Sequence, residues 1–168
     1  VCPGLINAHC HSAMTLFRGL ADDLPLMSWL NDHVFPAEAR YVTPEMVYCC
    51  SKLAAAEMIL SGTTTVADGY FFESEAVRAF NEAGLRSIAA QGIIDFPAPG
   101  VPSPDRNIEA AKTFLADFHH TPLATEHHTK GKTACRYLQL PPVYARRRDY
   151  SRSCSNQGDV RHNTCPAP

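Results

Sequence analysis

The sequence lacks any apolar run of the roughly 18 residues needed to cross a bilayer, and no charged-then-apolar segment resembles a secretory leader. It also lacks a strong charge of either sign. Fifteen Lys and Arg residues face 17 Asp and Glu residues, a formal net charge of −2. Such a balance gives no electrostatic basis for binding nucleic acid or an anionic membrane, so we expect neither partner.

A disulfide framework is missing as well. The seven cysteines are odd in number, and Cys49 and Cys50 are adjacent on a predicted helix, where neighbouring side chains point apart. The His and Cys residues near the C-terminus lack the paired spacing of a zinc ribbon or finger. Without a leader, reduced thiols in a cytoplasmic protein are the better interpretation.

What is present is an alternation of strand-like and helix-like segments. Thr43 and Pro44 suit the N-cap and first position of a helix. Ser74 could cap a second helix, which Gly84 would end. The predicted strands are residues 4–9 (buried), 63–68 and 85–94, and the predicted helices are 43–61, 74–83 and 105–118. This order predicts the α/β class with a parallel sheet.

The pattern is lost after His120. The three arginines at 146–148 must stay solvated, and no apolar period runs through residues 121–168. We therefore predict two regions: a folded region over 1–120, and a disordered tail over 121–168 that is foreign to it. The start at Val1, inside a strand-like segment, suggests a piece of a longer protein.

His9 and His11 are the strongest candidates for a functional site. Alternation along a strand sends both side chains to the same side, so two imidazoles could reach one ion. Neutral imidazole binds zinc, iron and nickel. Taken alone, this spacing is more often that of a strand end or loop that faces water, and only the surrounding motifs favour a metal site.

The surrounding motifs carry a resemblance to a known family. The segment PGLINAHCH (residues 3–11) resembles the opening of the barrel in the amidohydrolase superfamily. SAMTLFRGLADDL (12–24) and Trp29-Leu30 resemble the branch that holds S-adenosylhomocysteine/5-methylthioadenosine deaminases and chlorohydrolases. SGTTTVAD (61–68) is similar to the second strand of that branch. The resemblance runs from residue 1 to about residue 118.

The resemblance implies a TIM-type (β/α)8 barrel with its site at the carboxyl ends of the strands, of which residues 1–120 would form the N-terminal half. It implies that His9 and His11, with ligands on later strands, surround a divalent ion that activates water. We expect zinc, with iron or nickel as alternatives. The proton-transferring glutamate would lie beyond this chain, so no catalytic residue is assigned here and the chain by itself should be inactive.

Two further residues match substrate-binding positions of that branch. Glu38 falls where its deaminases hold the ribose hydroxyls, and the alternative is a solvated loop glutamate. Trp29 could stack on a purine, and ordinary core packing is an equal alternative. Asp68 could cap a helix, support a ligand or act directly. Gln91 stands where related deaminases often carry arginine, which leaves the exact substrate open.

The predicted function is hydrolysis of a C–N bond, namely deamination of an adenosine-type nucleoside. One alternative is a chlorohydrolase or guanine-type deaminase of the same superfamily. Another is a non-catalytic interaction protein whose Cys/His-rich tail binds a metal or a partner. The sequence leaves the oligomeric state open.

Overall fold

Four parallel strands form the sheet of the computed structural model, which describes residues 2–94, 96–100, 103–118 and 134–139. The strands are β1 (Leu5–Cys10), β2 (Thr63–Tyr70), β3 (Arg86–Ile93) and β4 (Ala134–Gln139). They lie in the order β1-β2-β3-β4, and every neighbouring pair is parallel. Because parallel neighbours need a crossover connection, a helix stands between consecutive strands.

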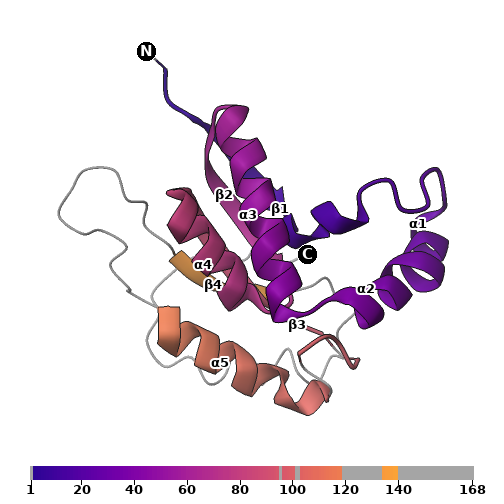
Figure 1. Ribbon diagram of the computed structural model, residues 1–168. Coiled ribbons are helices and arrows are strands. Elements are labelled where there is room, and N and C mark those ends of the chain that lie inside the picture. The colour runs from indigo at the N-terminus through magenta and orange to yellow at the C-terminus, as the bar shows by residue number, and fades with distance from the viewer. Residues whose placement is uncertain (1, 95, 101–102, 119–133, 140–168) are drawn as a thin grey trace, which may run out of the picture.

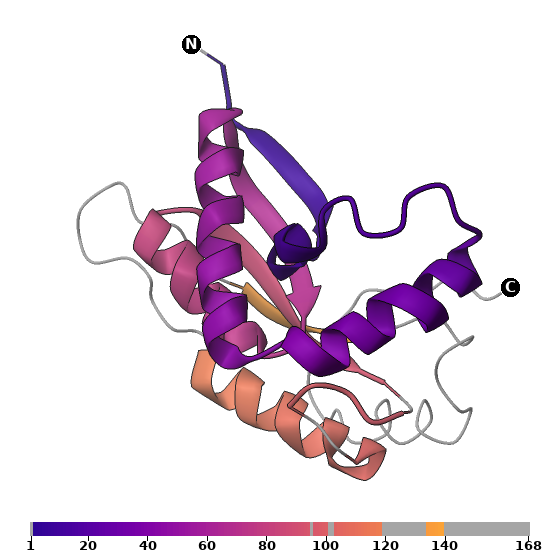
Figure 2. The ribbon, with the colours of Figure 1, turned by 45° about the vertical axis from the view of Figure 1, so that its right-hand side comes forward.

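Three crossover helices follow one another along the sheet (Figures 1 and 2). They are α3 (Pro44–Leu60), α4 (Glu73–Ala83) and α5 (Asn107–Phe118), the last preceded by a 3-10 turn, η3 (Pro104–Arg106). The predicted α/β class with a parallel sheet is confirmed. Four shorter segments lie between β1 and α3: the 3-10 helix η1 (Ser12–Phe17), α1 (Leu26–Ser28), the π-helix η2 (Trp29–Val34) and α2 (Phe35–Tyr41).

The ends of α3 follow from its sequence, and those of α4 only in part. The Thr43 hydroxyl accepts a hydrogen bond from the Met46 amide at 3.2 Å and caps α3. Gly84, at φ 77°, ends α4 as expected. The predicted Ser74 cap is wrong: α4 begins one residue earlier, after Phe72, whose φ of 50° is unusual for a non-glycine residue.

The core lies between the sheet and its helices. Val47 of α3, Val66 of β2 and Phe80 of α4 are all fully buried in one cluster. A second cluster joins Val77 of α4 and Phe114 of α5 to Ala89 of β3, and through it α5 packs on the sheet. Burying a side chain of this size contributes about 1.5–3 kcal/mol, so these contacts hold the helices on the strands.

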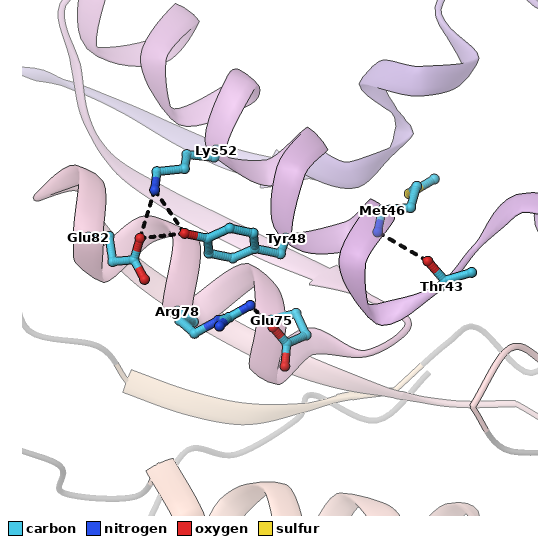
Figure 3. A network of polar contacts seen from close by, with 7 residues as sticks. All are labelled: Thr43, Met46, Tyr48, Lys52, Glu75, Arg78 and Glu82. Atoms are coloured by element: carbon cyan, nitrogen blue, oxygen red, sulfur yellow. Dashed lines mark hydrogen bonds and ion pairs between the residues drawn. The ribbon is translucent and has the colours of Figure 1, made fainter.

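On the solvent side, a polar network ties α3 to α4 (Figure 3). The Tyr48 hydroxyl donates to Glu82 Oε2 at 2.5 Å, and Lys52 Nζ donates to the same oxygen at 2.7 Å. The Arg78 guanidinium lies over the Tyr48 ring, 4.0 Å from its centroid. Because these groups are exposed, solvent screens them and the network adds little to stability.

Strand β1 corrects one expectation. It was predicted as buried, yet Leu5 and Ile6 are 63% and 71% exposed. Among the described residues β1 pairs with β2 alone, so one of its edges is open. An apolar strand is buried only where neighbouring strands and helices cover it, and the local sequence does not encode that cover.

Strand β4 differs from a second expectation, namely that residues 121–168 are disordered. Residues 134–139 lie inside the predicted disordered tail, yet they pair in parallel with β3, Ile88 opposite Ala134. The expectation of disorder is therefore wrong for these six residues. The rest of the predicted tail, 121–133 and 140–168, lies outside the described residues. In the described ranges no helix has the length and apolarity needed to cross a bilayer, and Cys2, Cys10, Cys49 and Cys50 are free thiols.

Candidate metal and nucleoside site

The two predicted histidines meet where β1 ends. The ring centroids of His9 and His11 are 5.0 Å apart, with the rings nearly perpendicular at 76°. Between Asn7 and Cys10, β1 departs from regular register with β2, so an irregularity lies directly before His11. Such bulges commonly re-aim side chains beside a site. The structure thus brings together the pair that the spacing predicts.

His11 is oriented by β2. Its Nδ1 atom lies 2.6 Å from the carbonyl oxygen of Gly69. A carbonyl can only accept, so Nδ1 carries the proton and, in the neutral ring, Nε2 keeps its lone pair. A backbone carbonyl on the far nitrogen is a usual support for a metal-binding imidazole. His11 is therefore a candidate metal ligand through Nε2.

The residue after His11 is fixed by Asp68. The Ser12 amide donates to Asp68 Oδ1 at 2.8 Å, and the Ser12 hydroxyl donates to Oδ2 at 2.5 Å. The Ser12 and Ser51 hydroxyls lie 2.9 Å apart, which connects the carboxylate to α3. Burial raises the pKa of Asp68, and the two Ser12 donors partly offset that rise. Asp68 thus caps η1 from the neighbouring strand and holds the turn that carries His11.

Glu38 lies on α2 and not in a solvated loop. It is 5% exposed, and its Oε1 accepts a hydrogen bond from the Tyr70 hydroxyl at 2.7 Å. Burial raises the pKa of this carboxyl, while the Tyr70 hydrogen bond and the charge of His11 act in the opposite direction. The solvated-loop alternative is therefore wrong. The π-helix η2 leads directly into α2, and such segments often occur at functional sites.

Trp29 and Gln91 lie on elements that border this region. The Trp29 indole donates to the Leu20 carbonyl at 3.1 Å, so it fastens the loop between η1 and α1 while its ring stays half-buried. Stacking of this ring on a substrate stays a prediction. Gln91 is buried near the end of β3, directly opposite Tyr70 in the sheet.

The buried Glu73 and the half-buried Cys10 lie near Asp68, and burial together with this carboxylate raises the pKa of both. Glu73 is fully buried, and neither carboxyl oxygen has a hydrogen-bond partner among the described residues. Burial and the nearby Asp68 raise the pKa of Glu73 well above its ordinary value, with a smaller opposing effect from the Tyr70 backbone. Burial and Asp68 also raise the pKa of Cys10 to about 12. The Cys10 thiol is therefore protonated at neutral pH, and burial beside Asp68 favours the protonated form of Glu73.

Tyr70, Ser12 and Glu73 belong to the site but were not predicted from the sequence. Tyr70 could have been found, because it lies two residues after Asp68, at the spacing of one strand face. Ser12 forms its contacts with residues 39 and 56 positions away, and no local pattern announces them. Glu73 resembles any acidic residue in the first turn of a helix.

The site fits a divalent ion in part. Two adjacent imidazoles, one of them oriented by a carbonyl, match the nitrogen ligands that zinc prefers. A tetrahedral zinc site takes more than two ligands, however, and the described residues hold no cluster of three or more His, Cys, Asp or Glu able to bind a metal.

Parallel strands joined by helices, with paired imidazoles at the carboxyl end of a strand, are typical of the (β/α)8 class of metal-dependent hydrolases. The sequence matches the Amidohydrolase family over residues 1–137, past residue 120 where the sequence analysis ended the folded region. The chain therefore belongs to the amidohydrolase family.

Three proteins of known class are similar to this chain in sequence or in structure. The 5-methylthioadenosine/S-adenosylhomocysteine deaminase 1 of Syntrophus aciditrophicus is 50% identical over 123 residues, which are 73% of this chain and 28% of that protein. The structure of an adenosine deaminase from Xanthomonas campestris with bound zinc has a TM-score of 0.69 and 41% identity, over 79% of this chain and 29% of that one.

The third is the atrazine chlorohydrolase from Arthrobacter aurescens complexed with zinc, with a TM-score of 0.65 and 21% identity, over 86% of this chain and 36% of that one. At this identity the likeness supports the fold alone. In each comparison this chain spans little more than a third, or less, of the matched protein.

Proposed function

We propose that this chain supplies part of the metal centre and the ribose-binding carboxylate of a deaminase that acts on an adenosine-type nucleoside. The observation that carries the proposal is the His9–His11 pair, with Nδ1 of His11 held by the Gly69 carbonyl. The deaminase from Syntrophus, half identical to this chain over the matched residues, supports the same reaction class.

His9 and His11 would hold the divalent ion, with zinc proposed first and iron or nickel as alternatives. The adenosine deaminase from Xanthomonas campestris has zinc bound in its structure, which supports zinc as the first choice. When bound, such an ion acidifies water and so makes a nucleophile available near neutral pH. The chain's own contribution is orientation: Gly69 fixes the His11 ring, and Asp68 fixes the turn that follows it.

Glu38 would recognise the ribose of the substrate. A carboxylate can accept hydrogen bonds from two vicinal hydroxyls, and its burial strengthens each of them because little water competes. Trp29, half-buried on η2, would stack on the purine. The expected partner is thus a purine nucleoside.

No proton-transferring residue is assigned in this chain, and we expect the 168 residues alone to turn over no substrate, because the described residues hold two candidate ligands only. The assignment of residues 1–120 to the N-terminal half of the barrel, to which β4 adds a further strand, and a cytoplasmic location are part of the proposal. The free thiols of the described cysteines support the location.

The test is a substrate panel on a completed barrel. Residues 1–118 are joined to the C-terminal portion of the Syntrophus deaminase, and ammonia release is measured with 5-methylthioadenosine and guanine, and chloride release with a chloro-triazine. The proposal predicts turnover of the nucleoside. Turnover of guanine or the triazine in its place would favour the alternative enzymes. A stable, zinc-loaded protein inactive on all three would favour the non-catalytic alternative.

A further inference from the structure

Glu38 is held from the sheet by one hydroxyl. Tyr70 lies at the end of β2 and Glu38 lies on α2, 32 residues earlier in the chain, and their hydrogen bond is 2.7 Å long. The two side chains are 7% and 5% exposed. Because this hydrogen bond is buried, it holds the Glu38 side chain of α2 in a fixed position relative to β2.

Tyr70 is itself firmly placed. Its backbone pairs with Gln91 of β3, and its ring packs on Phe71 with the centroids 4.8 Å apart. The centroid of the His11 ring lies 6.3 Å from that of Tyr70. A tyrosine side chain has only two rotatable angles, so a packed ring sets the position of its hydroxyl.

The Tyr70 hydroxyl contacts only one of the two carboxylate oxygens of Glu38. Tyr70 bonds to Oε1, and within the described part of the chain Oε2 of Glu38 accepts no hydrogen bond. Oε2 is not one of the fully buried oxygens that lack a partner, so a ligand hydroxyl can reach it and donate to it. The hydroxyl of Tyr70 thus selects which oxygen is free and where it points.

We propose that Tyr70 is a positioning residue: by holding Oε1 of Glu38 it presents Oε2 to a vicinal diol and so sets the preference for nucleoside over free base. The inference rests on the proposed ribose role of Glu38. Without the hydroxyl, Glu38 can rotate among side-chain conformations, and each bound nucleoside must order it again.

The experiment measures dissociation constants for 5-methylthioadenosine and for adenine by ligand-observed NMR on the full 168-residue chain. The variants are Tyr70→Phe, which removes only the hydroxyl, and Glu38→Gln. Tyr48→Phe is a matched control, because it also removes a tyrosine hydroxyl bonded to a glutamate, but on the outer face of α3 (Figure 3).

We expect the ratio of the two dissociation constants to favour the nucleoside in the parent chain and in Tyr48→Phe. In Tyr70→Phe it should fall roughly tenfold through weaker nucleoside binding, as for one lost hydrogen bond to a charged group, with adenine unchanged. Glu38→Gln should reduce the preference at least as much.

If Glu38→Gln removes the preference and Tyr70→Phe does not, the positioning role is wrong and the ribose role stands. Equal weakening of both ligands in Tyr70→Phe marks a structural role and also overturns the inference. A parent chain without any preference for the nucleoside, or a preference that survives Glu38→Gln, overturns the ribose assignment and the inference with it.

Discussion

Nδ1 of His11 lies 2.6 Å from the carbonyl oxygen of Gly69, a contact that joins the end of β1 to the end of β2. Through this contact the neighbouring strand sets the direction of the His11 ring, and in the neutral ring the lone pair is on Nε2. Asp68, Gly69 and Tyr70 are consecutive, and each supports a different part of the site: Ser12, His11 and Glu38.

The paired histidines predict weak zinc binding by the 168-residue chain. Two imidazoles make an incomplete ligand set, so calorimetry should give a dissociation constant of roughly micromolar order or weaker. His9→Ala and His11→Ala should each weaken it at least about tenfold, a loss of about 1.4 kcal/mol. The control is His33→Ala, since His33 is exposed on η2. Tight binding that survives both site substitutions would show that other ligands are responsible.

The Ser12–Asp68 contact predicts a measurable coupling in stability. Ser12→Ala and Asp68→Asn each disturb a buried pair of hydrogen bonds and should destabilise the chain by about 1–3 kcal/mol. Because both act on one contact, the double variant should lose less than the sum, with a coupling of about 0.5–3 kcal/mol. Urea unfolding followed by circular dichroism gives the free energy of unfolding of the parent, the two single variants and the double variant. Simple additivity would mean that the two residues do not interact.

The buried Glu73 predicts that stability falls as pH rises. Its pKa is raised in the folded state, so above its ordinary value of 4.5 the folded chain holds a proton that the unfolded chain has released. The unfolded state then binds fewer protons, and the free energy of unfolding decreases with increasing pH until the folded-state pKa is passed. Glu73→Gln removes this contribution. It should flatten the profile and stabilise the chain at pH 8 relative to the parent.

The urea concentration at the midpoint of unfolding, measured at pH 5 and pH 8 for the parent and Glu73→Gln, tests this pH dependence. Glu75→Gln is the control, since Glu75 lies in the same first turn and pairs with Arg78. An unchanged pH profile in Glu73→Gln would show that Glu73 is ionised or solvated in the folded chain.

The ribose role of Glu38 predicts a change mainly in affinity. In the barrel completed with the Syntrophus C-terminal portion, Glu38→Ala should raise KM more than it lowers kcat, because the ribose is held alike in the ground and transition states. Steady-state kinetics with 5-methylthioadenosine measures the split. A loss confined to kcat would place Glu38 at the reacting atoms instead.

Much of the fold could be predicted from sequence because its signals are local. Thr43 and Pro44 start α3, Gly84 ends α4, and the strand-helix alternation identifies the class. The exposure of Leu5 and the pairing of β4 could not be predicted, since both depend on which strands lie beside them. No helix was predicted over residues 26–41, where the chain passes from α1 through the π-helix η2 into α2.

The candidate site likewise has a part that local sequence predicts and a part that depends on the fold. His9 and His11 are close in sequence, so strand geometry alone brings them together. The groups that orient them come from β2 and α3, and Tyr70 reaches Glu38 only after the chain has folded back. Local patterns therefore predict the candidate ligands, while the residues that position them require the structure.

If His9 and His11 form part of a metal centre for deamination, removing either imidazole should remove the ion and the activity together. In the completed barrel, deamination of 5-methylthioadenosine and bound zinc are measured for the parent, His9→Ala, His11→Ala and His33→Ala. We expect each site substitution to lower both zinc content and kcat/KM, the latter by at least about a hundredfold, while His33→Ala matches the parent. Full activity with undiminished zinc in His9→Ala and His11→Ala would contradict the metal-centre assignment.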